Sequence, residues 1–368
     1  MKTSDAAFLP GRSHMATYKI LILGASYGSL LGAKLALAGH TVKLVCLPEE
    51  AALINAEGAR VRLPSRDVDG LVDLNTKTMP GDVSAGGTGE VHPADYDLVG
   101  LAMQEPQYRA PEVRDLLARV AEAKIPCMSI MNMPPLTYLK RIPGIDAEAL
   151  TDCYTDASVW DPFDPSLMTL CSPDPQAFRP PDEKVNVLQV GLPTNFKAAH
   201  FDADAHTGIL RDLETDIANL RFDLDGRQID LPVKLRVHDS VFVPLAKWSM
   251  LMAGNYRCVQ KDGMQSIEAA VHADLNASEA VYDWVVTLSM ALGAKREDLV
   301  PFEKYANAAR SLRNPSSAAR ALAGGAPYIE RVDRLVQKIA AQHGMQSDVV
   351  DETVVLVDGW LEANRQKV

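Results

Sequence analysis

The feature that most constrains the fold is an apolar run leading through a glycine-containing turn into a helical segment, within residues 18–39. Residues 18–24 are almost continuously apolar, as is typical of a strand buried on both faces of a parallel sheet. Residues 28–38 are rich in leucine and alanine and end at Gly39, as a helix does. A second β-branched run at 41–47 completes a strand–turn–helix–strand unit, which predicts a doubly wound α/β domain.

The turn departs from the Gly-x-Gly-x-x-Gly pattern of dinucleotide-binding turns. Aligned on Gly24 it lacks one residue, and aligned on Gly28 it has Leu23 and Ala25 at the first two glycine positions. A turn of this kind still places backbone N–H groups and a helix N-terminus against a pyrophosphate, and alanine blocks the approach less than any larger side chain. We therefore predict nucleotide binding by Gly24, Ala25, Ser26, Tyr27 and Gly28. The alternative is a generic glycine turn without a nucleotide, whereas the lack of Gly-Lys-Ser/Thr excludes a P-loop.

The end of the second predicted strand should select between NAD and NADP, because an acid there favours NAD and an arginine favours NADP. The residues present are Cys46, Leu47 and Pro48, which do neither. Glu49 and Glu50 follow and are explained as first-turn acids of a helix. The predicted cofactor is thus NADP or NAD, and this strand end does not distinguish them.

The β-α-β alternation continues through strand-like residues 96–102, an amphipathic helix at 111–124 and a strand at 126–132. The glycine-rich residues 76–95 are expected to form a loop. Residues 150–240 are rich in proline and aspartate, and predict additional strands and loops rather than further βαβ units. Beyond them the pattern is helical, with helices expected at 241–259, 272–292, 315–323, 328–343 and 348–364.

These shifts in pattern divide the chain into four parts. Residues 1–15 are expected to be a tag remnant and leader, because Gly-Arg-Ser-His-Met at 11–15 resembles an expression-vector sequence, and Met15 is taken as the natural start. Residues 16–145 are predicted to form a dinucleotide-binding Rossmann domain and residues 146–240 an inserted or linking segment of strands and loops. Residues 241–368 are predicted to form a helical domain for substrate binding and oligomerisation.

The net charge of −11 argues against binding to nucleic acid or to an anionic membrane surface. The chain has no run of about 18 apolar residues that would predict a membrane span. Its five cysteines are dispersed without metal-ligand spacing, which is typical of buried thiols in a reducing compartment and predicts a cytoplasmic protein. His200 and His206 lie near two aspartates but lack a ligand signature, so no metal site is predicted.

Residues 22–40 (ILGASYGSLLGAKLALAGH), with VKLV at 42–45 and LINAEG at 53–58, resemble the ketopantoate reductase (2-dehydropantoate 2-reductase) family, as a divergent member. The resemblance covers residues 18–135 and is weaker over 241–365. It implies a Rossmann domain followed by a helical domain similar to the C-terminal part of 6-phosphogluconate dehydrogenase. It also implies reduction of a 2-oxo acid to its 2-hydroxy acid with NADPH.

The resemblance assigns roles to residues that follow the predicted strands. Asn132 matches the family's asparagine beside the nicotinamide, and Gln104, next to Met103, matches its strand-end glutamine near the cofactor. The family's lysine three residues before that glutamine is Leu101 here. Met103, Gln104 and Asn132 are therefore predicted to contact the cofactor, and Asn132 to be catalytic.

The family also carries a catalytic lysine, which protonates the carbonyl oxygen, on a helix with asparagines one and two turns later. One alignment puts Met250 at the lysine position, and a shift of three residues puts Lys247 there with Asn255 at the second asparagine. In a regular helix Lys247, Leu251 and Asn255 share one face, and a partly buried lysine can act as a general acid. Lys247 is therefore the predicted proton donor and Asn255 a predicted substrate contact, with a solvated lysine as the alternative.

A serine pair in the same family holds the substrate, and Ser316 and Ser317 match it. Helix N-capping after Asn-Pro explains these two serines equally well. The family's later glutamate falls on Tyr328 when counted back from His343, with Glu330 two residues away.

Together these patterns predict an NAD(P)-dependent oxidoreductase acting on a small, anionic 2-oxo or 2-hydroxy acid or a related carbonyl compound. A homo-oligomer built on the C-terminal helices is expected, because such bundles often expose an apolar face. The alternative is a divergent relative without hydride transfer, either a nucleotide-binding sensor or a non-redox enzyme using the same interdomain cleft.

Overall fold

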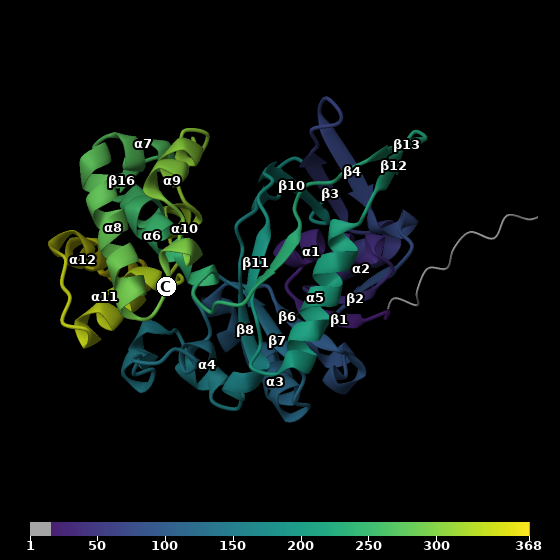
Figure 1. The fold of residues 1–368 in the computed structure, drawn as a ribbon, viewed down its shortest axis with the longest axis horizontal. Coiled ribbons are helices and arrows are strands. Elements are labelled where there is room, and N and C mark those ends of the chain that lie inside the picture. Colours follow the sequence, from purple (N-terminus) through teal and green to yellow (C-terminus); the bar gives the residue numbers. More distant parts are fainter. Residues whose placement is uncertain (1–15, 368) are drawn as a thin grey trace, which may run out of the picture.

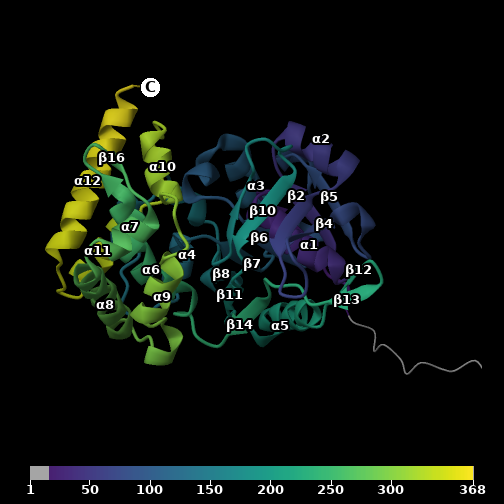
Figure 2. The same ribbon diagram turned by 90° about the horizontal axis from the view of Figure 1, so that it is seen from above.

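A computed structural model describes residues 16–367, and the expected tag remnant and leader at residues 1–15 lie outside the described residues. The centre of the fold is an eight-stranded sheet, and helical residues from 244 onward lie beside it (Figures 1 and 2). From edge to edge its strands are β14 (Leu235–His238), β11 (Phe196–Ala199), β8 (Met168–Ser172), β7 (Cys127–Ile130), β6 (Leu98–Leu101), β1 (Lys19–Leu23), β2 (Thr41–Val45) and β5 (Asp82–Gly86).

The sheet is parallel except where β8 meets β11. Strands β1, β2, β6, β7 and β8 therefore end at the same edge, with Leu23 level with Val45 and Leu101. Strand order reverses between β1 and β6, and the crevice outside such a switch point is where doubly wound folds bind ligands. The helices of this part are α1 (Tyr27–Leu37), α2 (Pro48–Glu57), α3 (Pro111–Glu122), α4 (Leu136–Leu139) and α5 (Asp204–Ala218).

The apolar runs that predicted the central strands are fully buried in the structure. Every residue of β6 and of β7 is buried, and so is every residue of β1 after Lys19. Helices cover both faces, so these strands have no polar face to alternate with. The doubly wound sheet predicted from the sequence is confirmed.

Two predictions about the sheet were wrong. Residues 76–95 contain the edge strand β5, a short strand that pairs only with β2. Residues 146–240 complete the same sheet, because they supply β8 and the βαβ unit β11–α5–β14. Long loops rich in proline and aspartate separate these short strands and conceal their pairing in the sequence.

A smaller sheet packs against α1, above the main sheet in the view of Figure 1. Its strands are β4 (Leu71–Asn75), β3 (Arg60–Pro64), β10 (Val187–Leu192) and β9 (Gln176–Phe178). Val61 and Leu188 of this sheet share one apolar cluster with Leu30 of α1. A hairpin, β12 (Phe222–Leu224) and β13 (Arg227–Ile229), follows α5.

The C-terminal part is helical, as predicted. Its elements are α6 (Lys247–Met250), β15 (Val259–Gln260), β16 (Gly263–Met264), α7 (Ile267–His272), α8 (Leu275–Ala291), α9 (Phe302–Ala309), α10 (Ser317–Ala323), α11 (Val332–Gln342) and α12 (Asp348–Arg365). Among the described residues, none of the helices combines the length and apolar character needed to cross a membrane.

Two of the predicted helices differ from the structure in ways that affect the site. The single helix expected at 241–259 is a succession of a 3₁₀ turn, the short α6, a π-helical turn at Leu251–Asn255 and a second 3₁₀ turn. The helix expected from residue 328 begins only at Val332, and residues 327–331 are not helical. One buried cluster continues from Val99 of the sheet to Trp248 and Tyr282, so both parts share a core.

Candidate active site

The turn between β1 and α1 has the geometry of an anion-binding helix N-terminus. Gly24 has a φ of +99°, and a Cβ there would lie 2.7 Å from the carbonyl oxygen of Ala102, so only glycine fits. A Cβ at Gly28 would meet Ile22 at 2.9 Å, so this glycine lets α1 pack closely on β1. Within residues 16–367 the N–H groups of Ala25, Ser26 and Tyr27 donate no hydrogen bond. They are therefore free to bind an anion.

The segment after β8 lies beside this turn. The hydroxyl of Tyr27 donates a hydrogen bond of 2.8 Å to the carbonyl oxygen of Pro175, and burial raises the pKa of Tyr27 to about 12. The neighbouring Asp174 accepts a hydrogen bond from Ser172 and pairs with Lys197 at 2.9 Å. Residues 172–175 thus form one wall next to the N-terminus of α1.

The end of β2 carries an exposed apolar side chain next to an ion pair. Leu47 is 75% exposed, and Glu50 forms an ion pair with Arg179. Burial raises the pKa of the Cys46 thiol to about 12, so this cysteine is a neutral thiol at physiological pH.

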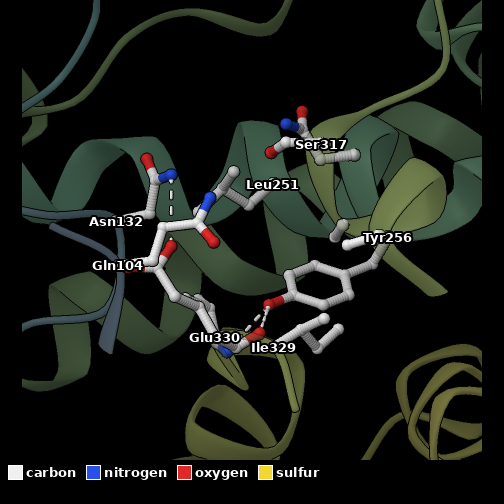
Figure 3. A pocket seen from close by; sticks show the side chains of 11 residues that line it. Gln104, Asn132, Leu251, Tyr256, Ser317, Ile329 and Glu330 are labelled. Carbon is white, nitrogen blue, oxygen red and sulfur yellow. Dashed lines mark hydrogen bonds between the residues drawn. The ribbon is translucent and has the colours of Figure 1, made fainter. Parts of the chain in front are cut away.

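A small cavity lies between the carboxyl ends of β6 and β7 and the helical part. Its volume is about 30 Å³, which is room for one or two water molecules. Gln104 and Asn132 line it from the sheet side (Figure 3). The rest of the lining comes from the helical part: Leu251, Asn255, Tyr256, Ser317, Ala318, Ala321, Ile329, Glu330 and Val332.

Glu330 and Asn132 point toward each other across this cavity (Figure 3). The amide Nδ2 of Asn132 lies 3.5 Å from Oε2 of Glu330, while its Oδ1 is buried without a hydrogen-bond partner among the described residues. Burial, together with the nearby charge of Glu105, raises the pKa of Glu330 to about 7. Hydrogen bonding from Asn132 and from backbone N–H groups opposes the shift. Glu330 therefore exchanges a proton near neutral pH.

Tyr256 fixes the backbone that carries Glu330. Its hydroxyl accepts a hydrogen bond of 2.9 Å from the N–H of Val332 and donates one to the carbonyl oxygen of Glu330. The first of these bonds satisfies a free N–H at the start of α11. Tyr256 thus caps the helix and holds the residue before it in place.

The two predicted serines have different positions. Ser316 is buried, accepts a bond from the N–H of Ala319 and donates one of 2.6 Å to the carbonyl oxygen of Asn255. Ser316 is therefore an N-cap that also ties α10 to the π-helical turn. Ser317 is exposed and lines the cavity.

Lys247 does not line the cavity. Its Nζ donates a hydrogen bond of 2.7 Å to the carbonyl oxygen of Pro173 and lies 3.7 Å from Asp174. Burial lowers the pKa of Lys247, and the charge of Asp174 opposes that shift. Leu251 lies one regular turn after Lys247, and the π-helical turn that begins there changes only the face on which Asn255 lies. Leu251 and Asn255 both line the cavity, whereas the side chain of Lys247 reaches Pro173 and Asp174 instead, contrary to the expectation that Lys247 and Asn255 serve one site.

No protein-family model matches the sequence, and no curated protein matches it. Solved structures do match. A ketopantoate reductase from Ralstonia eutropha JMP134 is 17% identical, with a TM-score of 0.58 over 94% of this chain and 99% of that one. A 2-dehydropantoate 2-reductase from Methylococcus capsulatus is 11% identical, with a TM-score of 0.62 over 94% and 97%. This chain has the ketopantoate reductase fold.

The ketopantoate reductase fold is shared with a D-mandelate dehydrogenase, solved with NADH and anilino(oxo)acetate. That enzyme is 14% identical, with a TM-score of 0.61 over 94% of this chain and 99% of that one. The resemblance seen in the sequence is thereby confirmed at the level of the fold. Identities this low establish the architecture and leave the activity to the residues of the site.

Within this fold, four of the predicted residues meet at the cavity: Gln104, Asn132, Asn255 and Ser317. Lys247 and Ser316 lie outside its lining. Sequence reasoning missed Tyr256 and the role of Glu330, because the helix was expected to start at residue 328. The Gly324–Gly325 and Pro327 breaks just before Glu330 were the available signal that this segment is not helical. Within residues 16–367 no group of three or more His, Cys, Asp or Glu side chains could hold a metal ion.

Proposed function

We propose that the protein is an NAD(P)-dependent oxidoreductase that reduces a small 2-oxo acid, or a related carbonyl compound, to the alcohol. The observation that carries this proposal is the polar cavity at the carboxyl ends of β6 and β7, which pairs Asn132 with a carboxyl that titrates near neutrality. The switch point of the sheet and the free N–H groups of the first turn lie at the same sheet edge.

Two observations fit a nicotinamide dinucleotide. The N–H groups of Ala25, Ser26 and Tyr27 would bind the pyrophosphate, and the unpaired Oδ1 of Asn132 would accept an N–H of the carboxamide. Met103 and Gln104 follow β6 and would border the nicotinamide. When bound, the reduced nicotinamide supplies the hydride. The family resemblance makes NADP the first choice.

The substrate would occupy an enlarged form of the cavity. Amide and hydroxyl groups of Gln104, Asn255 and Ser317 can hydrogen-bond a carbonyl or a carboxylate. A cavity of about 30 Å³ is too small for a 2-oxo acid, so the sheet side and the helical side must move apart for entry. Lys247, predicted as the proton donor, would have to leave Pro173 and Asp174 to reach the substrate.

A divergent relative without hydride transfer is the second candidate, either a nucleotide-binding sensor or a non-redox enzyme. It is favoured by the shortened turn and by the exposed Leu47 where a nucleotide enzyme has a ribose-binding group. The two candidates differ in whether a bound cofactor is oxidised.

The test is binding followed by turnover. We expect NADPH or NADH to raise the melting temperature, and the absorbance of the reduced cofactor to fall with one of pyruvate, 2-oxoisovalerate or phenylglyoxylate. Gly24→Ala should abolish the thermal shift, because its Cβ would press against Ala102 at an unfavourable φ. The control Gly89→Ala should keep the shift, because its Cβ would meet nothing within 4 Å. Failure of both cofactors to stabilise the wild type would contradict the redox proposal, and binding without turnover of these acids would favour the sensor.

We further propose a cytoplasmic homo-oligomer. Within the described chain all five cysteines are free thiols, as a reducing compartment requires. An apolar groove on α12 offers a surface for a second copy, since it contains Val355, which is 70% exposed, with Leu356 and Trp360. One of the structural neighbours is described as a dimeric ketopantoate reductase from Staphylococcus aureus.

A further inference from the structure

The cavity contains only one free ionisable group. Of the residues that line it, Glu330 and Tyr256 alone can titrate. The hydroxyl of Tyr256 already donates a hydrogen bond to the carbonyl oxygen of Glu330, and burial raises the pKa of that hydroxyl well above its usual value. The carboxyl of Glu330 is therefore the one group on the lining that can release a proton to a ligand.

Lys247 has a structural role rather than that of a proton donor. Its ammonium group lies between the carbonyl oxygen of Pro173 and the carboxylate of Asp174, and only 11% of its side chain is exposed. Asp174 also pairs with Lys197, so the cluster joins α6, β11 and the segment after β8. Lys247 thus links the helical part to residues 172–175, beside the turn between β1 and α1.

From these contacts we infer that Glu330 donates the proton to the substrate's carbonyl oxygen, the role that the family resemblance assigns to a lysine. This inference rests on the proposed function. The carbonyl carbon accepts the hydride, the π electron pair moves to the carbonyl oxygen, and that oxygen takes the proton of the Glu330 carboxyl. The carbonyl is reduced, the nicotinamide is oxidised, and Glu330 is left as a carboxylate that regains its proton from water.

The surroundings of Glu330 keep it protonated until it is needed. Facing it are the carboxylate of Glu105 beside β6, the ammonium group of Lys247 on α6, and the hydroxyls of Tyr27, Tyr108 and Tyr256. Burial is the main cause of its high pKa, and the carboxylate of a bound 2-oxo acid would raise that pKa further. The amide of Asn132 stabilises the carboxylate that remains after transfer.

The experiment compares Glu330→Gln, Glu330→Asp and Lys247→Met on the 2-oxo acid that the wild type reduces fastest. We expect Glu330→Gln to lower kcat by about 100-fold or more while the Kd for NADPH stays within about threefold. The wild-type kcat/KM should fall as pH rises through about 7, because the acid of the free enzyme must be protonated. Glu330→Asp should recover part of kcat and show the same decline with rising pH. Lys247→Met should have a kcat within about tenfold of the wild-type value and keep that decline. A hundredfold loss in Lys247→Met with little loss in Glu330→Gln would overturn the inference.

A second measurement needs neither cofactor nor substrate. In the wild type, the infrared carbonyl stretch of a protonated carboxyl should disappear as pH rises, with a midpoint near pH 7. The band should be missing in Glu330→Gln. The control variant Glu303→Gln, which changes an exposed glutamate, should keep it. A spectrum without this band rejects Glu330 as the donor even if the wild type turns over. If the band is present but the protein binds no reduced nicotinamide, the protonated carboxyl of Glu330 is supported and the proposed reductase function is contradicted.

Discussion

At the scale of single residues, the carboxyl of Glu330 lowers the stability of the fold at neutral and alkaline pH. An ordinary glutamate has a pKa of 4.5, whereas burial raises that of Glu330 to about 7. The native state therefore holds a proton that the unfolded chain releases between these two values, and the free energy of unfolding declines as pH rises through that range. The buried carboxyl of Glu330 therefore lowers the free energy of unfolding once it is ionised.

Replacing Glu330 with glutamine should stabilise the protein, with the full effect above about pH 7. The rise in pKa from 4.5 to about 7 corresponds to at most about 3 to 4 kcal/mol, because the glutamine side chain has no charge to bury. Urea unfolding at about pH 8 should show Glu330→Gln to be the more stable protein, and the two should converge at about pH 4. Equal stability at both pH values would show that the carboxyl of Glu330 has an ordinary pKa.

How far single site residues could be predicted depended on their distance from a recognisable strand. Asn132 and Gln104 follow strands whose apolar runs are unmistakable, so their place at the sheet edge could be deduced. Glu330 follows a glycine and proline break with no periodic pattern, and its partner Asn132 is 198 residues away. Contacts of that kind are set by tertiary packing and have no local signal.

At the scale of elements, the π-helical turn and the start of α11 are joined by the hydroxyl of Tyr256. The sequence predicted a helix on each side but neither the π-helical turn nor the late start of α11. Helix propensity favours a regular helix through Met252 and Ala253, whereas the Gly324–Gly325 and Pro327 breaks disfavour a helix before α11. The hydrogen bonds of Tyr256 with Glu330 and Val332 then fix where α11 begins.

Tyr256→Phe should therefore affect catalysis more than its loss of stability explains. It leaves the N–H of Val332 and the carbonyl of Glu330 unpaired, which costs about 1–3 kcal/mol, and it frees the segment that carries Glu330. The control is Tyr282→Phe, which removes another buried hydroxyl, bonded to the carbonyl of Val300. Thermal unfolding should show similar losses in both, while kcat should fall at least tenfold in Tyr256→Phe alone. Parallel losses of kcat would assign Tyr256 a structural role only.

At the scale of the whole molecule, one buried cluster joins the sheet to the helical part. The two parts and their order could be predicted, since the sequence shows the pattern of a parallel sheet followed by the pattern of helices. The shared core could not be, because it is built from side chains such as Trp160 and Trp248 that are simply apolar in their own segments. A molecule with a continuous core can widen this cavity only by a limited movement of the two sides.

The surface of the whole molecule also predicts how two copies associate. The groove on α12 has apolar walls, with Lys261 together with Asp351 and Glu352 among its lining residues. Opposite charges around one apolar patch suit a twofold interface, since the lysine of one copy can meet the acids of the other. We therefore expect a dimer of this 40.0-kDa chain, held by the α12 grooves.

Val355→Asp tests this association, because it places a charge among the apolar residues that line the groove. Light scattering after gel filtration should show a dimer for the wild type and a monomer for Val355→Asp. Val349→Asp is the matched control, since Val349 is also exposed on α12 but outside the groove, and this variant should stay dimeric. Lys261→Glu should weaken the dimer, and adding Asp351→Lys should restore it, because only a contact between opposite charges across the interface responds to both changes. A wild-type monomer, or a dimer that tolerates Val355→Asp, would place any association of this protein on another surface.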